Sequence, residues 1–165
     1  MAHHRTHRFS NRRRYEVNPP ARDLAQYIAN RSHIVVKAAV RAENEKGELL
    51  LIQHAEHGHW RIPAGQMRPG EAIEDTAHRE LWEETGWTAT HMTLEGLHSG
   101  PNLRHLHASG DEEYFVIALF RAHIVQDSLV ESRVNSEAGL KFFDLKSLPR
   151  LNDLSRLLLR YSEIE

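Results

Sequence analysis

The chain has 165 residues, of which 40% are hydrophobic and 27% charged, with a net charge of −2. This composition fits one globular domain and excludes a disordered chain, and the lack of any run of about 20 apolar residues excludes a membrane-spanning helix. The absence of cysteine excludes disulfides, thiolate catalysis and cysteine-bound zinc and is compatible with a reducing cytosol. With the composition and the lack of an apolar run, it leads us to expect a soluble, cytoplasmic protein with no membrane partner.

The first part of the chain is basic. Residues 1–14 contain five arginines and no acidic residue. We predict a disordered, solvated arm over residues 1–19, with contact to nucleic acid or another polyanion as the alternative. The rest, residues 20–165, contains no repeat or linker and is predicted to form a single domain.

The elements predicted after the arm alternate between helices and strands. A short helix is expected over 21–30, and two strands, over 33–41 and 48–54, are joined by a turn. A second helix is expected from about Ala72 to Thr85, ended by Gly86 in the left-handed conformation. Three further strands and a closing leucine-rich helix are predicted, at about 88–97, 114–125, 140–144 and 151–158. This order predicts an α/β (α+β) domain with a mixed sheet between helices.

The predicted helix at 72–85 carries acidic residues on its apolar side. Ile73, Ala77 and Leu81 form one stripe at a spacing of four residues, and Glu80 and Glu84 fall on the same stripe. Glu83 stands beside them, so the three carboxylates share an arc of about 100° on a helix of 3.6 residues per turn.

Partly buried carboxylates at this distance repel one another, and a divalent cation would relieve that repulsion. Hard oxygen ligands are those that Mg²⁺ or Mn²⁺ prefers. The alternative is a solvated acidic face, in which Arg79 and Glu83 form an ion pair of a few tenths of a kcal/mol.

Residues flanking the glutamates decide between these interpretations. The segment Gly65–Trp87 resembles the signature of the Nudix hydrolases, through Gly65, Glu71, Arg79, Glu80, Leu81, Glu83, Glu84 and Gly86 at the family's spacing. The one departure is Trp87, where the family has an aliphatic residue, and there we expect altered packing rather than lost chemistry. The resemblance covers roughly residues 20–165 and implies an α/β/α sandwich whose loop–helix–loop motif is catalytic.

The resemblance also implies the reaction and its residues. Members of the family, including small bacterial MutT-like enzymes, hydrolyse a nucleoside diphosphate linked to a group X. Position by position, Glu80, Glu83, Glu84 and the Gly65 carbonyl would bind Mg²⁺ or Mn²⁺, while Arg79 would pair with Glu71 and orient the glutamates. Glu137 lies where relatives place a loop glutamate that completes the metal site or acts as base, so the base is either Glu80 or Glu137.

Several other residues are weaker candidates. The acids 111–113 form a cluster that we interpret as a solvated turn, with a substrate or metal contact as the alternative. The histidine pairs 57/59 and 105/107 lack a recognisable zinc spacing. His54, His57 and Trp60 could contact nucleotide or serve packing, and Pro101 marks either an ADP-ribose hydrolase or a simple turn.

The resemblance leaves the group X open. ADP-ribose or a nucleotide sugar stands level with (oxidised) nucleoside triphosphates, ahead of dinucleoside polyphosphates and the 5′ end of RNA. Nucleic acid is the weaker partner because the body of the chain is neutral to acidic. A non-catalytic, nucleotide-sensing module is the alternative function, and the resemblance leaves a homodimer open.

Overall fold

The computed structural model describes residues 32–53, 58–124 and 139–161. The elements in chain order are β1 (Ser32–Glu43), β2 (Leu49–Gln53), β3 (Trp60–Arg61), β4 (Ala64–Gln66), α2 (Ile73–Thr85), β5 (Met92–His98), β6 (Arg104–Leu106), β7 (Glu112–His123), β8 (Leu140–Phe143), the 3₁₀ helix η1 (Leu145–Ser147) and α4 (Asp153–Tyr161). The predicted arm and the predicted helix at 21–30 lie outside the described residues. No helix in the described part is long and apolar enough to cross a bilayer.

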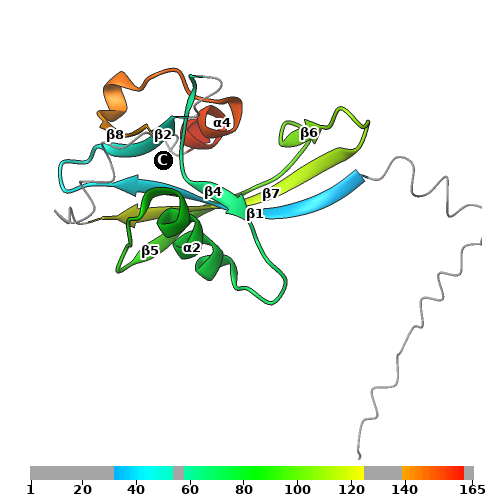
Figure 1. Cartoon of the computed structure of the whole chain (residues 1–165), viewed down its shortest axis with the longest axis horizontal. Helices are drawn as coiled ribbons and strands as arrows, with labels where there is room; N and C mark the ends of the chain where they lie inside the picture. The colour runs from blue at the N-terminus through cyan, green and yellow to red at the C-terminus, as the bar shows by residue number, and fades with distance from the viewer. Residues whose placement is uncertain (1–31, 54–57, 125–138, 162–165) are drawn as a thin grey trace, which may run out of the picture. The chain divides into compact units, whose positions relative to one another are not determined.

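The strands form one mixed sheet of eight strands (Figure 1). Its main path runs β3-β2-β1-β7-β5, with β4 paired to β1, β6 to β7 and β8 to β2. The two longest strands, β1 and β7, are parallel along their whole length, from Ser32 opposite Glu112 to Glu43 opposite His123. The remaining strand pairs are antiparallel. The mixed sheet predicted from the sequence is confirmed.

Side chains of β1 alternate between the two faces of the sheet, and each face has its own core. Ala38, Val40 and Ala42 join the cluster that contains Ala77 and Leu81 of α2. Ala39 joins the cluster that contains Leu158 and Leu159 of α4. The helices α2 and α4 therefore cover opposite faces, and the expected sandwich is confirmed (Figure 1).

The apolar stripe of α2 is where the sequence pattern predicts it. Ala77 and Leu81 are fully buried, and Ile73 packs against the same cluster. Two acids in the first turn stabilise the positive end of the helix dipole. At the other end Gly86 takes a φ of 76° and donates its N–H to the Trp82 carbonyl at 2.8 Å, which confirms the left-handed cap.

Three short strands and one boundary differ from the sequence prediction. The expected strand at 88–97 begins only at Met92, and Ala89 before it is buried in the cluster that contains Ala77 and Leu81 of α2. β3, β4 and β6 have two or three residues each, too few to show a period. They exist because longer neighbours pair with them, as β6 pairs with β7 in a hairpin through the turn at 107–111.

Trp87, the departure from the family signature, is a core residue. It is 2% exposed, and its ring packs edge-on against Phe142 at 5.8 Å between centroids. Its indole Nε1 is buried without a hydrogen-bond partner among the described residues.

We predict that Trp87→Leu changes stability and leaves metal binding unchanged. The substitution removes ring packing but also removes the unpaired N–H, so the loss should be smaller than the ~3–5 kcal/mol of a tryptophan-to-alanine change. Urea unfolding measures the first effect and Mn²⁺ titration the second. Weaker Mn²⁺ binding by the folded variant would contradict the packing role.

Candidate active site

Arg79 ties α2 to the loop that precedes it. Its Nε and Nη2 donate to the two oxygens of Glu71 at 2.6 and 2.9 Å, and Nη2 also donates to the Gln66 carbonyl at 3.0 Å. Its Nη1 donates to Glu80 and, at 3.2 Å, to Glu83. A guanidinium has five N–H groups, and these contacts use all of them. The predicted pairing of Arg79 with Glu71 is confirmed.

The charges of this pair are fixed by their contacts. Hydrogen bonds from the Arg79 side chain and, next in importance, from the Arg68 backbone hold the pKa of Glu71 at about 2. Thr76 adds a hydroxyl donor at 2.8 Å. The same bond to Glu71 raises the pKa of Arg79 above its ordinary value. Glu71 therefore stays ionised, and Arg79 stays cationic.

Gly65 makes room for the Glu80 carboxylate. A Cβ atom added at Gly65 would lie within 3.0 Å of the Glu80 carboxyl carbon and both its oxygens. Gly65 pairs with Ala38 across β4 and β1, so the carboxylate rests directly on the edge of the sheet. The Glu80 side chain is only 12% exposed there. The need for glycine at this position is thus steric, because its backbone has no positive φ.

Glu84 is held by the strands on the other side of the motif. Arg61 of β3 donates to its two oxygens at 2.6 and 3.0 Å, a bidentate pair, and the Ala64 N–H donates at 3.0 Å. Such charge-assisted bonds fix both position and orientation. The last turn of α2 is therefore attached to the start of β4.

Glu83 is the most exposed of the three glutamates. Its side chain is 38% exposed, and Arg68 and Arg79 both approach it, at 3.3 and 3.2 Å. Each of the three carboxylates thus has an arginine partner. Among the described residues no three acidic or histidine side chains converge on a point that could hold a metal ion. Arginines therefore relieve the repulsion for which the sequence pattern suggested a cation.

The donor atoms nevertheless fit a hard divalent cation in kind. Glu80 and Glu84 offer partly buried carboxylate oxygens on one helix, as the stripe predicted, and the glycine at 65 lets a carboxylate reach the strand edge. Arginine-paired carboxylates retain further lone pairs that can coordinate an ion. Glu137, the predicted ligand from outside the helix, lies outside the described residues.

Comparison with known proteins decides the family. The model of the NUDIX domain matches residues 32–161 of this chain. The chain belongs to the NUDIX family. Its fold resembles that of the MutT NUDIX hydrolase from Burkholderia pseudomallei, with 26% identity, a TM-score of 0.59 and coverage of 78% of this chain and 98% of that one.

Two curated relatives are similar over shorter segments. The putative 8-oxo-dGTP diphosphatase of Bacillus subtilis is 34% identical over 106 residues, 64% of either protein. The 8-oxo-dGDP phosphatase NUDT18 of Mus musculus is 44% identical over 54 residues, which are 31% of this chain and 17% of that protein. The match therefore spans less than two thirds of either relative.

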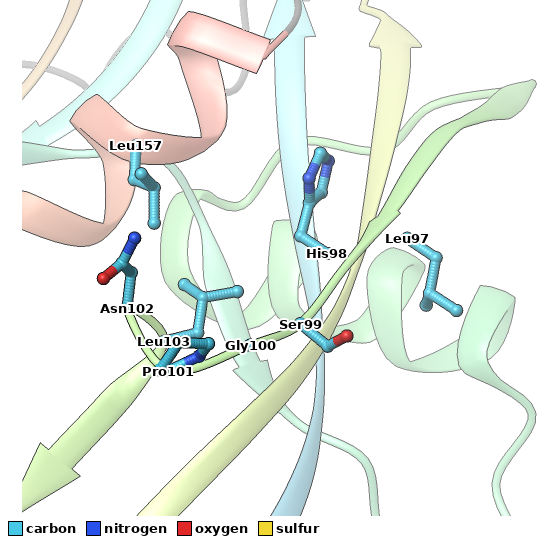
Figure 2. Close-up of a pocket in the computed structure, with 8 residues that line it drawn as sticks. All are labelled: Leu97, His98, Ser99, Gly100, Pro101, Asn102, Leu103 and Leu157. Carbon is cyan, nitrogen blue, oxygen red and sulfur yellow. The ribbon is translucent and has the colours of Figure 1, made fainter.

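Two adjacent cavities of the NUDIX domain lie where the loop at 99–103 meets α4. The first, of about 280 Å³, is lined by residues 97–103 and Leu157, which faces Asn102 across it (Figure 2). The second, of about 290 Å³, shares residues 102–103 and Leu157, and adds Phe115 together with Arg104, His105 and residues 152–154. It combines an aromatic ring with several polar side chains, a composition suited to a small polar ligand.

The other sequence candidates have structural explanations. Of the acids 111–113, Glu112 and Glu113 belong to β7 rather than to a turn, and they pair with Arg104 and His107. His105 and His107 stack edge-on without a third ligand in the described chain.

The remaining two candidates that can be placed serve packing and a turn. Trp60 packs against Phe143 at 4.7 Å. Pro101 sits in a turn closed by the bond from the Leu103 N–H to the Gly100 carbonyl, and it lines the first cavity. His54 and His57 lie outside the described residues.

The sequence interpretation missed Arg61, Arg68 and Lys37. Arg61 binds Glu84, which is 23 residues further along the chain, and Lys37 of β1 contacts Phe115 on the neighbouring strand β7. Nothing in local periodicity marks either contact. The available signals were the charges of Arg61 and Arg68, close to β4 in the chain, and the charge of Lys37 within an otherwise apolar strand.

We predict that Gly65→Ala leaves the domain folded and weakens Mn²⁺ binding by about 10–100-fold, because the new methyl group displaces the Glu80 carboxylate. Mn²⁺ titration followed by electron paramagnetic resonance measures the affinity. Gly47→Ala is the control, since Gly47 has a φ of 75° and open space, so its substitution strains the backbone alone. Equal Mn²⁺ affinity of the Gly65 variant and wild type would contradict the steric role.

A second prediction concerns acid stability. Glu71 in the unfolded chain titrates near its ordinary pKa of 4.5, but its folded pKa is about 2. Its stabilising contribution is therefore complete above about pH 4.5 and is lost as the pH falls toward 2. Glu71→Gln should be less stable than wild type at neutral pH, and the difference should shrink through that window. Urea unfolding from about pH 7 to about pH 3 measures it, and a constant difference would contradict the assignment.

Proposed function

We propose that this NUDIX protein is a divalent-metal-dependent hydrolase that cuts a phosphoric anhydride bond in a nucleoside diphosphate linked to a group X, giving a nucleotide and phosphorylated X. The observation that carries the proposal is the Glu80 carboxylate seated against Gly65 and held there by Arg79. This arrangement keeps one acid at the strand edge with a fixed orientation.

Glu80, Glu83, Glu84, the Gly65 carbonyl and Glu137 are the proposed ligands of Mg²⁺ or Mn²⁺. When bound, the ion supplies charge neutralisation for the anhydride and a lowered pKa for an attacking water. Arg79 acts as a positioning residue, because all its N–H groups bind the protein. Arg61 holds Glu84 in the same way. The base is Glu80 or Glu137.

For the substrate, purine nucleoside di- or triphosphates oxidised at C8 are our first choice. The names of the relatives in Bacillus subtilis and Mus musculus refer to 8-oxo-dGTP and 8-oxo-dGDP. The second cavity is near the lower end of the volume range of ligand pockets, and the aromatic side chain of Phe115 lines it. ADP-ribose and nucleotide sugars are the next candidates. A cytoplasmic location and a basic arm over 1–19 are further proposals drawn from the sequence, and a homodimer is one that the family resemblance leaves open.

The test is product analysis on a nucleotide panel with Mg²⁺ or Mn²⁺ in water labelled with heavy oxygen. The panel contains 8-oxo-dGTP, 8-oxo-dGDP, dGTP, ADP-ribose, a nucleotide sugar, a dinucleoside tetraphosphate and RNA with a 5′ triphosphate. We expect cleavage of an oxidised purine nucleotide, with the label on a single phosphorus. Nucleotide binding without product formation would contradict the proposed hydrolase and would support a nucleotide-sensing module.

Glu84→Gln tests the metal site within this proposal. Loss of one carboxylate charge should lower the hydrolysis rate by at least about 10–100-fold. Glu74→Gln is the matched control, since it neutralises an exposed glutamate on the first turn of the same helix. A Glu84 variant as active as wild type would exclude Glu84 as a ligand.

A further inference from the structure

Lys37 lies on the central strand β1, which pairs with β4, the strand that carries Gly65, and with β7, the strand that carries Phe115. Lys37 itself pairs with Gln66 of β4. The Gln66 carbonyl in turn accepts a bond from Arg79. On the other side, the Lys37 Nζ lies 3.8 Å from the centroid of the Phe115 ring on β7.

The ammonium group of Lys37 has no carboxylate partner at contact distance. No described acid forms an ion pair with it, and its close neighbour is the face of the Phe115 ring. Burial lowers the pKa of Lys37, whereas the charges of Glu113 and Glu80, which lie beyond contact distance, raise it. A half-buried cation without a contacting anion is costly, so such a group is commonly functional.

The arginines of the site differ from Lys37 in this respect. Arg61, Arg68 and Arg79 each bind one or more of the glutamates of α2. Their charges are therefore already matched by the protein. Of the four basic residues described around the motif, Lys37 is the one whose charge is available to a ligand.

The position of Lys37 relates it to the second cavity. Phe115, whose ring Lys37 covers, lines that cavity together with Arg104, His105 and Asn152. Glu80, the acid at the strand edge, is close enough to Lys37 to raise its pKa. Lys37 therefore covers a ring that lines the cavity and lies within electrostatic range of Glu80.

We propose that Lys37 binds a phosphate oxygen of the substrate, on the phosphate that connects the nucleoside in the Phe115 cavity to the bond that is cut. This inference rests on the proposed function and adds to it a substrate-binding residue outside the signature. A lysine suits the role because its compact ammonium acts as a point charge on a phosphate, without the fixed geometry of a guanidinium. The Phe115 ring holds the flexible side chain in place through a cation–π contact.

The test compares Lys37→Met, Lys37→Arg and Lys141→Met. Lys141→Met is the matched control, because Lys141 also covers a phenylalanine ring, Phe143, at 5.2 Å, on β8. On the nucleotide cleaved by wild type, Lys37→Met should raise KM by about tenfold or more with a smaller effect on kcat, since a charge-assisted bond to phosphate is lost. Lys37→Arg should recover part of the loss, and Lys141→Met should behave as wild type.

Binding of inorganic pyrophosphate, followed by phosphorus NMR without turnover, separates this inference from the proposed function. If wild type cleaves no nucleotide but binds pyrophosphate more tightly than Lys37→Met does, the proposed function fails and the role of Lys37 stands. If Lys37→Met matches wild type in KM and in pyrophosphate affinity, the inference is wrong. Equal losses in Lys37→Met and Lys141→Met, or no pyrophosphate binding by wild type, would also overturn it.

Discussion

The arrangement of the site depends on one guanidinium group. Arg79 connects the loop at Glu71, the backbone of β4 at Gln66, and two glutamates of its own helix. Because these partners come from three segments, the contacts fix the rotation of α2 and its height above the sheet together. The apolar contacts of Ala77 and Leu81 press the helix onto the core but are non-directional. The hydrogen bonds of Arg79 supply the direction.

A second tether acts at the other end of the helix. Arg61 and the Ala64 N–H hold Glu84 against the strands before Gly65. The helix is thus attached to the sheet edge at both ends of its acidic stripe, and Glu80 lies between the two attachments. Charged groups here replace the solvent that an exposed glutamate would have, which keeps the carboxylates in place at a moderate energetic cost. A preorganised set of oxygen ligands is what metal-dependent catalysis at this position would require.

The sequence predicted the parts of this protein that have a strong local pattern. The long strands, the stripe of α2, its glycine cap and the closing leucine helix all have periodicities that identify their type and approximate bounds. The resemblance of Gly65–Trp87 to the Nudix signature identified the family and the pairing of Arg79 with Glu71.

What the sequence could not predict depends on the pairing of strands. β3 places Arg61 beside Glu84, and the parallel register of β1 and β7 places Lys37 above Phe115. Both contacts join residues that are far apart in the chain, and no spacing rule relates them. Two of the three arginine partners of the glutamates, Arg61 and Arg68, were missed for the same reason, which is why repulsion on the helix appeared to require a cation.

Gly65 has a consequence for how such a chain can change over time. Its backbone adopts a conformation open to any amino acid, and only the neighbouring carboxylate forbids a side chain. The folding of the domain and the proposed metal binding at its acidic edge are therefore under separate constraints at this residue. A single base change in a glycine codon can weaken the second without disturbing the first.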